Sequence, residues 1–469
     1  MTLLENRKNV NTITFFNILS TLILQGLTFI TAPIISRLLG VDNYGIASVY
    51  VTWVGLVSII FGLQTQSTLA VARNEYSLVE QPKYQSGVLF LSILSYVILS
   101  AAVIIFINPI SKVLNMSVLM IITLLLHSFG QFVVTFINTK FTYEFKAKSN
   151  FFMTTGVALS TIILSLVLIC IIPSKNGFWG RILGLAIPYT VVGGICAVSI
   201  ILSGKTLVSR KYWKFCIPLC SPIVLHNVSN LVLNQSDRVM IQGLMDNASV
   251  GVYSLAYSFG SVLSAIWSAL NNSWLPFYYE YNRKKQYEIM LEKAKNYIEL
   301  FTILTIGFVY LSVEVFHIFA SDIYWGGTQL IPLFSIGFYF MFMYSFPVNY
   351  EFYNKKTKLI AVGTILSALI NIFLNYIFIK KYGIYGAALA TVISFGLQYI
   401  FHHICACKFI PSTNKYPFRL LFFAPYCFGF LLSIIIWYYI QDYILIRWVI
   451  AFILGSIELY RMVKRKSIF

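Results

Sequence analysis

Long stretches without charge constrain this chain more than any other feature. Twelve windows of 21 or more residues contain no Asp, Glu, Lys or Arg, and they are 9–36, 43–72, 84–111, 113–139, 149–174, 182–204, 215–236, 247–279, 323–350, 359–379, 382–407 and 420–441. A helix needs about 20 apolar residues to cross the hydrocarbon layer of a membrane. Membrane β-barrels instead alternate apolar and polar residues, and stretches such as VILSAAVIIFI (97–107) do not alternate. The windows therefore predict an all-α integral membrane protein.

Two further segments bring the predicted number of transmembrane helices to fourteen. The first covers about 298–320 and contains Glu299 and Glu314, and the second covers about 443–460. Composition supports this class, because 58% of the 469 residues are hydrophobic and only 11% are charged. A soluble protein of this length could not bury so much apolar surface.

The distribution of basic residues predicts the orientation of the helices in the membrane. With the N-terminus placed in the cytoplasm, 26 of the 34 Lys and Arg residues fall on the cytoplasmic side. Basic loops stay cytoplasmic, so both termini are predicted to lie there. The net charge of +18 is then explained by topology, and no nucleic-acid partner is expected. The eight basic residues predicted outside are Arg37, Lys112, Lys175, Arg181, Arg238, Lys380, Lys381 and Arg447.

The longest connection, about 277–297, falls on the cytoplasmic side of this topology. It contains YNRKKQYEIMLEKAKNY (281–297), in which Tyr287, Met290, Leu291, Ala294 and Tyr297 recur at helical spacing. This pattern predicts an amphipathic helix that lies on the inner membrane surface.

Two pairs of motifs recur at a spacing of 206 residues. They are YGIASVY (44–50) with VGVYSLAY (250–257), and WGRILGLA (179–186) with YGAALATV (385–392). Upstream, Arg37 and Arg238 pair at a spacing of 201, which a five-residue insertion in the second loop would explain. Six helices precede the second copy, so the two copies have the same orientation. Such parallel repeats in transporters place the substrate path between the halves.

This repeat predicts three parts. Residues 1–214 form an N-lobe of six helices and residues 215–412 form a C-lobe of six helices. Residues 413–469 add two C-terminal helices.

Three stretches resemble one family of transporters. They are RLLGVDNYG (37–45), DRVMIQGLMDNASVGVYSLAY (237–257) and INIFLNYIFIKKYGIYGAALATVISF (370–395). Together they resemble the polysaccharide transporters, or Wzx-type flippases of lipid-linked oligosaccharides. That family belongs to the MOP superfamily, which also contains the MATE multidrug exporters and the MurJ lipid II flippases.

The resemblance implies a function as well as a two-lobed bundle. The expected activity moves undecaprenyl-diphosphate-linked oligosaccharide, such as an O-antigen or capsule repeat unit, from the inner to the outer leaflet of the bacterial cytoplasmic membrane. Alternating access driven by a cation gradient is the expected mechanism, with H⁺ or Na⁺ as the coupling ion and no other cofactor. Polysaccharide assembly proteins are the expected partners.

Two other functions stay open at this point. A MATE-type exporter of cationic drugs would share the same bundle. A membrane enzyme such as an O-antigen polymerase would typically need a large outer loop with catalytic groups. The predicted outer loops have only about 5–13 residues, in keeping with the short connections of a packed bundle, so no enzyme is expected.

Arg37 and Arg238 are the candidates for contact with the diphosphate. Arginine offers multidentate hydrogen bonds to phosphate oxygens, and ionisable residues inside a membrane are functional candidates. The alternative is that both side chains extend to the outer interface, as long basic side chains near helix ends do. Pro33 precedes Arg37 by one turn and could kink the helix so that its end turns inward.

Asp237 and Glu314 are the candidates for the coupling ion. A carboxylate inside a membrane must be paired, protonated or hydrated. Asp237 could instead neutralise Arg238, and Glu314 could serve packing between helices. Glu351 is predicted to form an interfacial ion pair, because Lys355 and Lys356 follow it closely.

The remaining polar residues of the apolar windows have weaker interpretations. His127 and His226 are expected to be hydrogen-bonded packing residues rather than proton relays. His402, His403, Cys405 and Cys407 lack the spacing of a zinc site, so no metal is expected. Several amides either bond neighbouring helices or line a cavity that reads sugar hydroxyls, and they are Gln64, Gln66, Gln131, Asn271, Asn272, Asn371 and Asn375.

Overall fold

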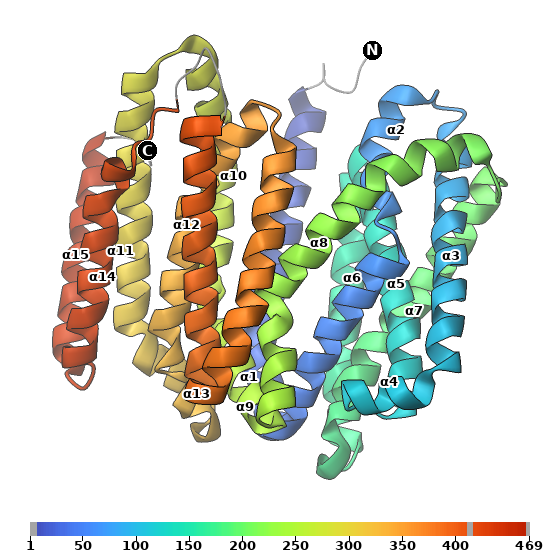
Figure 1. The fold of residues 1–469 in the computed structure, drawn as a ribbon, viewed down its shortest axis with the longest axis horizontal. Coiled ribbons are helices and arrows are strands. Elements are labelled where there is room, and N and C mark those ends of the chain that lie inside the picture. The colour runs from blue at the N-terminus through green and yellow to red at the C-terminus, as the bar shows by residue number, and fades with distance from the viewer. Residues whose placement is uncertain (1–6, 410–415, 466–469) are drawn as a thin grey trace. The chain divides into compact units, whose positions relative to one another are not determined.

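The computed structural model describes residues 7–409 and 416–465, and these residues form helices joined by short turns (Figure 1). The chain divides into two compact units, Met1–Gln235 and Ser236–Phe469. The first unit contains α1 (Arg7–Phe61), η1 (Thr65–Thr68), α2 (Leu69–Glu75), α3 (Gln81–Ile105), α4 (Ile107–Leu114), α5 (Val118–Tyr143), α6 (Ala147–Ile171), η2 (Ser174–Asn176), α7 (Gly177–Gly204) and most of α8 (Arg210–Leu244).

The second unit begins within α8. It continues with α9 (Asn247–Gly260), α10 (Val262–Lys284), α11 (Tyr287–Phe319), η3 (Asp322–Gly327), α12 (Leu330–Tyr353), α13 (Thr357–Ile404), the π-helical turn η4 (Cys405–Phe409), α14 (Leu420–Ile440) and α15 (Ile444–Arg465). Both α14 and α15 pack on α11 inside this unit. The predicted lobe boundary at 214/215 lies near the start of α8, and the predicted boundary at 412/413 lies outside the described residues. The division into three parts stays a prediction.

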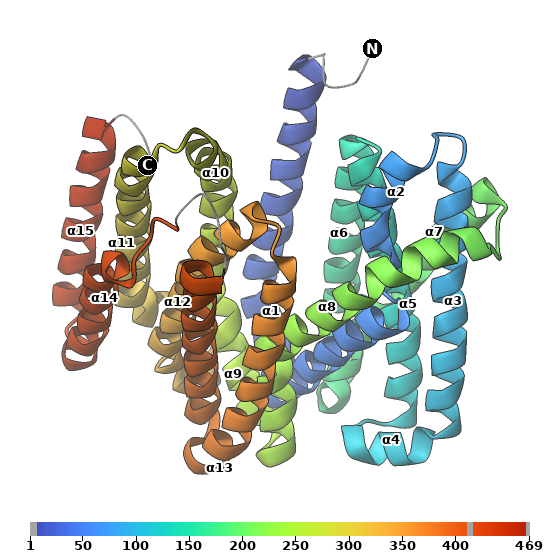
Figure 2. The same ribbon diagram turned by 45° about the horizontal axis from the view of Figure 1, so that its top comes forward.

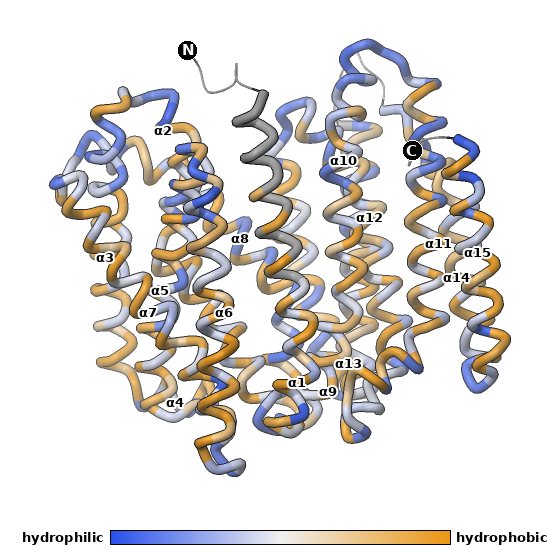
Figure 3. The backbone as a smooth tube through the Cα atoms, turned by 180° about the vertical axis from the view of Figure 1, so that it is seen from behind, coloured by the Kyte–Doolittle hydropathy of each residue, from blue (hydrophilic) through white to orange (hydrophobic). Residues whose placement is uncertain are grey.

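The helices confirm the predicted all-α membrane class. In the described part of the chain, eleven helical segments are long and apolar enough to cross a membrane. Hydrophilic residues gather in turns such as the one between α10 and α11 (Figure 3). Many large apolar side chains of these helices are exposed, as a surface in contact with lipid requires. The fourteen predicted spans and the predicted orientation stay predictions.

Two of the eleven segments contain a break in the helix. Gly40 interrupts α1 with φ 70° and ψ 171°, and Gly383 interrupts α13 with φ 60° and ψ −140°. Both residues have positive φ, which glycine adopts without the clash that a Cβ atom would cause. Figure 2 shows the two parts of α1 running in different directions. Each of these long helices therefore consists of two helices joined at a sharp turn, and Pro33 remains inside the first part of α1.

The prediction that 281–297 forms a helix on the membrane surface is wrong. The chain instead turns at Lys285 and Gln286, and α11 then runs without interruption from Tyr287 to Phe319. The side chains of Met290, Ala294 and Tyr297 are 0% exposed. Their helical spacing therefore reflects burial against neighbouring helices of the second unit rather than contact with a membrane surface.

Small residues permit the closest helix contacts in both units. A methyl group on Gly180 would lie 2.7 Å from the backbone nitrogen of Ile169, and one on Gly386 would lie 2.9 Å from that of Ile379. Lipid is as apolar as a leucine side chain, so close packing holds membrane helices together where the hydrophobic effect cannot. The matching contacts confirm that Gly180 and Gly386 are equivalent. They also make Ile169 and Ile379 equivalent positions, at a spacing of 210. This spacing exceeds 206 because the turn before Gly180 is four residues longer than the turn before Gly386.

Candidate functional site

A buried carboxylate forms the centre of a polar cluster in the second unit. Asp237, on α8, is 1% exposed. Its Oδ1 accepts a hydrogen bond from Asn375 Nδ2 at 2.6 Å, and its Oδ2 accepts from Thr391 Oγ1 at 2.9 Å and from the Tyr253 hydroxyl. The three donors come from α9 and from both halves of α13. A carboxylate that receives charge-assisted bonds from three neutral donors can stay ionised away from water.

Two asparagines extend this cluster. Asn375 Nδ2 also donates to Asn371 Oδ1 at 3.0 Å, and Ser236 Oγ donates to the same oxygen at 3.1 Å. Within the described residues, the buried Asn375 Oδ1 has no hydrogen-bond partner. An unpaired amide oxygen beside a carboxylate is a free ligand for a hard cation, because such ions prefer oxygen donors.

The local sequence explains how Asp237 reaches this position. Leu233 and Ile241 lie one helical turn before and after it, and both are buried. The three residues share one face of α8, since positions i and i+4 lie above one another on a helix. At the other side, Gly386 brings the two halves of α13 into contact, which places Thr391 and Asn375 around the same carboxylate.

Arg238 extends from α8 to different partners. Its Nε donates to Ser254 Oγ at 3.2 Å, and its guanidinium lies 5.0 Å from the ring centroid of Tyr257. The side chain is half-buried, and within the described residues it forms no ion pair shorter than 4.0 Å. Arg238 is therefore oriented by neutral groups, and its positive charge is not cancelled by Asp237 at contact distance.

Arg37 differs from Arg238 in its surroundings and in its place in the repeat. Arg37 is exposed and lies three residues before the break at Gly40. Gly40 precedes Gly45 by five residues, and Asp246, between α8 and α9, precedes Gly251 by five. Since the two turns lie at the same distance from the paired glycines, the turn between α8 and α9 does not contain the predicted five-residue insertion.

The predicted equivalence of Arg37 and Arg238 is therefore wrong. The spacing of 206 continues across the break and pairs Thr31 with Asp237. It likewise pairs Ala32, rather than Arg37, with Arg238.

Glu314 lies in an ion pair between two helices. Arg447 of α15 contacts both carboxylate oxygens of Glu314, with Nη1 at 3.0 Å from Oε2, and also donates to the Tyr310 carbonyl at 2.8 Å. Trp448 Nε1 donates to Glu314 Oε2 at 3.1 Å. Since Arg447 is only 1% exposed, it needs this partner. The geometry favours the packing role for Glu314 over binding of a coupling ion.

Glu351 also differs from its prediction. It is 0% exposed and lies 2.8 Å from His402 Nδ1, at the point where α12 and α13 meet. Its carboxylate is thus paired with a histidine in the interior, and the predicted interfacial pair with Lys355 and Lys356 is wrong. The sequence could not show this, because 51 residues separate the two partners.

Arg181 is a functional candidate that the sequence analysis assigned to an outer loop. It lies one turn inside α7, and its Nη1 donates to Ser165 Oγ at 3.1 Å. In the described part of the chain, Ser165 is its one hydrogen-bond partner and no carboxylate pairs with it. A guanidinium inside an apolar bundle without a counter-ion is a candidate for function. Gly177, Gly180 and Gly184 lie on both sides of Arg181 at helical spacing. This spacing could have indicated that the helix begins before the predicted window, which starts at residue 182.

Aromatic and imidazole rings lie near Arg181. The ring centroids of His127 and Tyr189 are 5.3 Å apart, and His127 Nδ1 lies 3.3 Å from the Tyr50 hydroxyl. Tyr189 and Tyr44 also lie near Arg181. His127 is buried and hydrogen-bonded, as predicted for a packing histidine.

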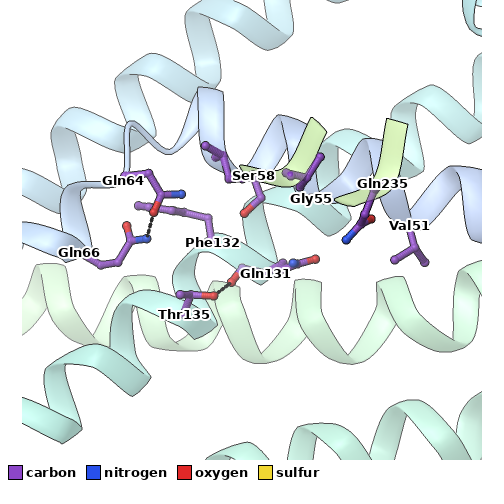
Figure 4. Close-up of a pocket in the computed structure, with 11 residues that line it drawn as sticks. Val51, Gly55, Ser58, Gln64, Gln66, Gln131, Phe132, Thr135 and Gln235 are labelled. Atoms are coloured by element: carbon purple, nitrogen blue, oxygen red, sulfur yellow. Dashed lines mark hydrogen bonds between the residues drawn. The ribbon is translucent and has the colours of Figure 1, made fainter. Parts of the chain in front are cut away.

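A cavity of about 270 Å³ with a mixed polar and apolar lining lies in the first unit, between α1, α5 and α8 (Figure 4). Four glutamines line it, together with hydroxyl and apolar groups, and the full lining is Val51, Gly55, Ser58, Ile59, Gln64, Gln66, Gln131, Phe132, Thr135, Leu231 and Gln235. No charged residue belongs to this lining. Three of the glutamines, Gln64, Gln66 and Gln131, were predicted as cavity lining or interhelical bonds.

Comparison with known proteins identifies one family and one distant relative. The model of the family described as "Polysaccharide biosynthesis protein" matches residues 12–281. The protein named "Lsg locus putative protein 1" of Haemophilus influenzae is 24% identical, over 73% of this chain and 84% of that protein.

Two solved structures share the fold. The lipid II flippase MurJ in an inward closed conformation aligns with a TM-score of 0.74 and 17% identity, over 97% of this chain and 99% of that one. An inward-facing MATE multidrug resistance transporter of the MOP superfamily aligns with a TM-score of 0.54 and 16% identity, over 80% and 92%.

Proposed function

This chain belongs to the polysaccharide biosynthesis protein family, and on that premise we propose that it is a flippase for undecaprenyl-diphosphate-linked oligosaccharide. The lipid-linked unit enters from the inner leaflet of the bacterial cytoplasmic membrane and leaves to the outer leaflet. The observation that carries the proposal is this family membership in a chain whose whole length has the MurJ fold. Assembly proteins that polymerise the sugar units then act on the product outside.

Arginines supply the contacts to the diphosphate. A phosphate group that crosses a medium of low dielectric constant needs positive partners with matching hydrogen-bond geometry. Arg238 is half-buried and held by Ser254 and Tyr257, and Arg181 offers a guanidinium without a carboxylate partner among the described residues. Arg37 contributes at the exposed end of its helix. The guanidinium groups of Arg238 and Arg181 each have five N–H donors, so donors beyond those in their present hydrogen bonds can bind phosphate oxygens.

The cluster around Asp237 is the proposed site of the coupling cation, H⁺ or Na⁺. Its carboxylate, the Asn375 amide oxygen and the Thr391 hydroxyl provide oxygen ligands from three helical segments. Binding of a cation there would draw the two halves of α13 towards α8, which couples the ion to helix position. Glu314 is the weaker candidate, because Arg447 and Trp448 already occupy its oxygens.

The alternative is a MATE-type exporter of cationic drugs, since the fold is shared. The unpaired guanidinium of Arg181 argues against it, because a positive site repels cationic substrates. Loss of drug resistance on deletion of the gene would support the exporter.

Deletion in the native host tests the main proposal. The strain should carry no second transporter for the same lipid, and the leaflet that holds the lipid-linked oligosaccharide is assayed after deletion. We expect the oligosaccharide to accumulate in the inner leaflet and to reach the outer one again when the gene is restored. Normal delivery to the outer leaflet in the deletion strain would refute the flippase.

A further inference from the structure

We propose that the glutamine-lined cavity of the first unit binds an uncharged sugar residue of the transported oligosaccharide. This inference rests on the proposed function and assigns the glycan a site whose lining contains no arginine. The four glutamines come from three separate segments, which are the turn after α1, α5 and α8. In Figure 4 the amides of Gln131 and Gln235 point toward the space between them.

The chemistry of the lining selects the class of ligand. An amide group offers both donors and an acceptor, which matches a sugar hydroxyl that also donates and accepts. Because no charged residue lines the cavity, neither a phosphate nor a cation would find a counter-charge. A lipid chain would leave the amides unpaired at a free-energy cost. Phe132 adds an apolar wall against which the carbon face of a sugar ring can pack.

Unused hydrogen-bonding groups indicate that the cavity is built for a ligand. Gln66 is 94% buried, since its exposed fraction is 6%, and its Oε1 has no partner within the described residues. A buried polar atom of this kind costs stability unless a ligand or water pairs with it. The side chains of Gln131 and Gln235 likewise form no hydrogen bond in the part of the chain that the structure describes.

The backbone that carries Gln64 is strained. Leu63 and Gln64 have φ of 55° and 53°, in the left-handed region that side chains other than glycine rarely adopt. Such strain persists where the surrounding contacts hold it, often at functional sites. Gln64 Oε1 accepts from Gln66 Nε2 at 2.8 Å and from Asn227 Nδ2 at 3.0 Å. These bonds fix the two glutamines in place, so the cavity keeps its shape before a ligand arrives.

The volume limits how much of the oligosaccharide can enter. At about 270 Å³ the cavity falls just below the range of about 300–1,000 Å³ that is typical of sites for drug-sized ligands. It therefore accommodates one sugar residue rather than a whole repeat unit. A site of this size could distinguish sugars by their hydroxyl pattern, because a missing hydroxyl would leave an amide unpaired.

Binding to the purified full-length protein tests the inference. The probes are the lipid-linked oligosaccharide extracted from the native host and undecaprenyl diphosphate without sugar, and the variants are Gln131→Leu and Gln235→Leu. Leucine is close to glutamine in size but cannot bond a hydroxyl. We expect each variant to bind the lipid-linked oligosaccharide about tenfold more weakly, as for a lost hydrogen bond. Undecaprenyl diphosphate should bind each variant and the wild type within about twofold.

A matched control is Gln286→Leu, which changes an exposed glutamine in the turn between α10 and α11. It should bind both probes as the wild type does. Gln235→Asn keeps the amide and serves if the leucine variants fail to fold, as judged by size-exclusion chromatography; its shorter side chain should still weaken oligosaccharide binding. Equal oligosaccharide binding by wild type and variants would overturn the cavity assignment. If the wild type binds neither probe, the proposed function fails instead.

Discussion

The two units share repeated motifs but differ at equivalent positions in the charged groups that they hold. The second unit buries the carboxylate of Asp237, whereas the first has Thr31 at the equivalent position, and the Thr31 hydroxyl donates to the Leu27 and Thr28 carbonyls of its own helix. The first unit embeds the guanidinium of Arg181, whereas the second has Ala387 there. The repeat therefore preserves packing glycines such as Gly180 and Gly386 while the chemistry of the two units diverges.

One pair of equivalent positions contacts the charged group in both units, although the charged groups themselves are not equivalent. The spacing of 210 pairs Ser165 of the first unit with Asn375 of the second. Ser165 accepts from Arg181, and Asn375 donates to Asp237. A fold can thus be duplicated while each copy acquires its own ionic group, because packing depends on small residues and function depends on a few polar ones.

The largest expected effect is a loss of stability when the ion pair between Arg447 and Glu314 is broken. Arg447→Met leaves the carboxylate of Glu314 without its partner, and breaking such a pair should cost about 3–5 kcal/mol in the free energy of unfolding. Thermal unfolding of the detergent-purified protein measures the loss. Adding Glu314→Gln should restore most of the stability, and the double variant should still transport. Loss of transport by a stable double variant would make Glu314 a second functional carboxylate. It would contradict the contrast between Asp237 as the ion site and Glu314 as a packing residue.

Asp237→Asn should abolish coupled transport while preserving the shape of the cluster. Without a negative charge the site no longer binds a cation, and we expect transport to fall at least a hundredfold, or about 2.7 kcal/mol. The measurement is the rate at which the lipid-linked oligosaccharide reaches the outer leaflet. Asp442→Asn is the control, since Asp442 is exposed in the same unit. Wild-type transport by Asp237→Asn would reduce the cluster to a packing element.

Arg181→Ala tests the charge of the first unit. We expect transport to fall about ten- to thirtyfold, since one charge-assisted contact to phosphate is worth about 1.5–2 kcal/mol. Arg181→Lys should recover part of the activity, because lysine keeps the charge without the planar fork. The exposed Arg283 provides the control substitution to Ala. If Arg181→Ala transports normally, the first unit holds no functional charge at this position.

The smallest effects are expected at Arg238 and Arg37. Arg238→Ala should lower transport about tenfold, because its partners Ser254 and Tyr257 hold the side chain in one orientation. Arg37→Ala should lower it only about twofold, as for an exposed charge at a helix end. Membrane expression should not change, and Arg→Lys should rescue in part. Full transport by the double Ala variant would assign both side chains to the membrane interface.

Much of this protein could be predicted from local patterns. Charge-free windows identify helices in lipid because the backbone there must bond to itself, and this requirement acts on each segment separately. The repeat at Gly180 and Gly386 was visible for a similar reason, since a tight contact demands a small residue whatever surrounds it. Asp237 was recognisable as unusual because placing a carboxylate so close to an apolar segment costs free energy.

The sequence by itself therefore determined the class of fold, the membrane environment and the family, because these follow from the composition and spacing of single segments. Only the tertiary structure decided which partner each charge has. Glu314 and Arg447 are 133 residues apart, and Glu351 and His402 are 51 apart. Whether a charge is neutralised depends on distances of a few ångströms between helices, and the spacing of residues along the chain does not contain those distances.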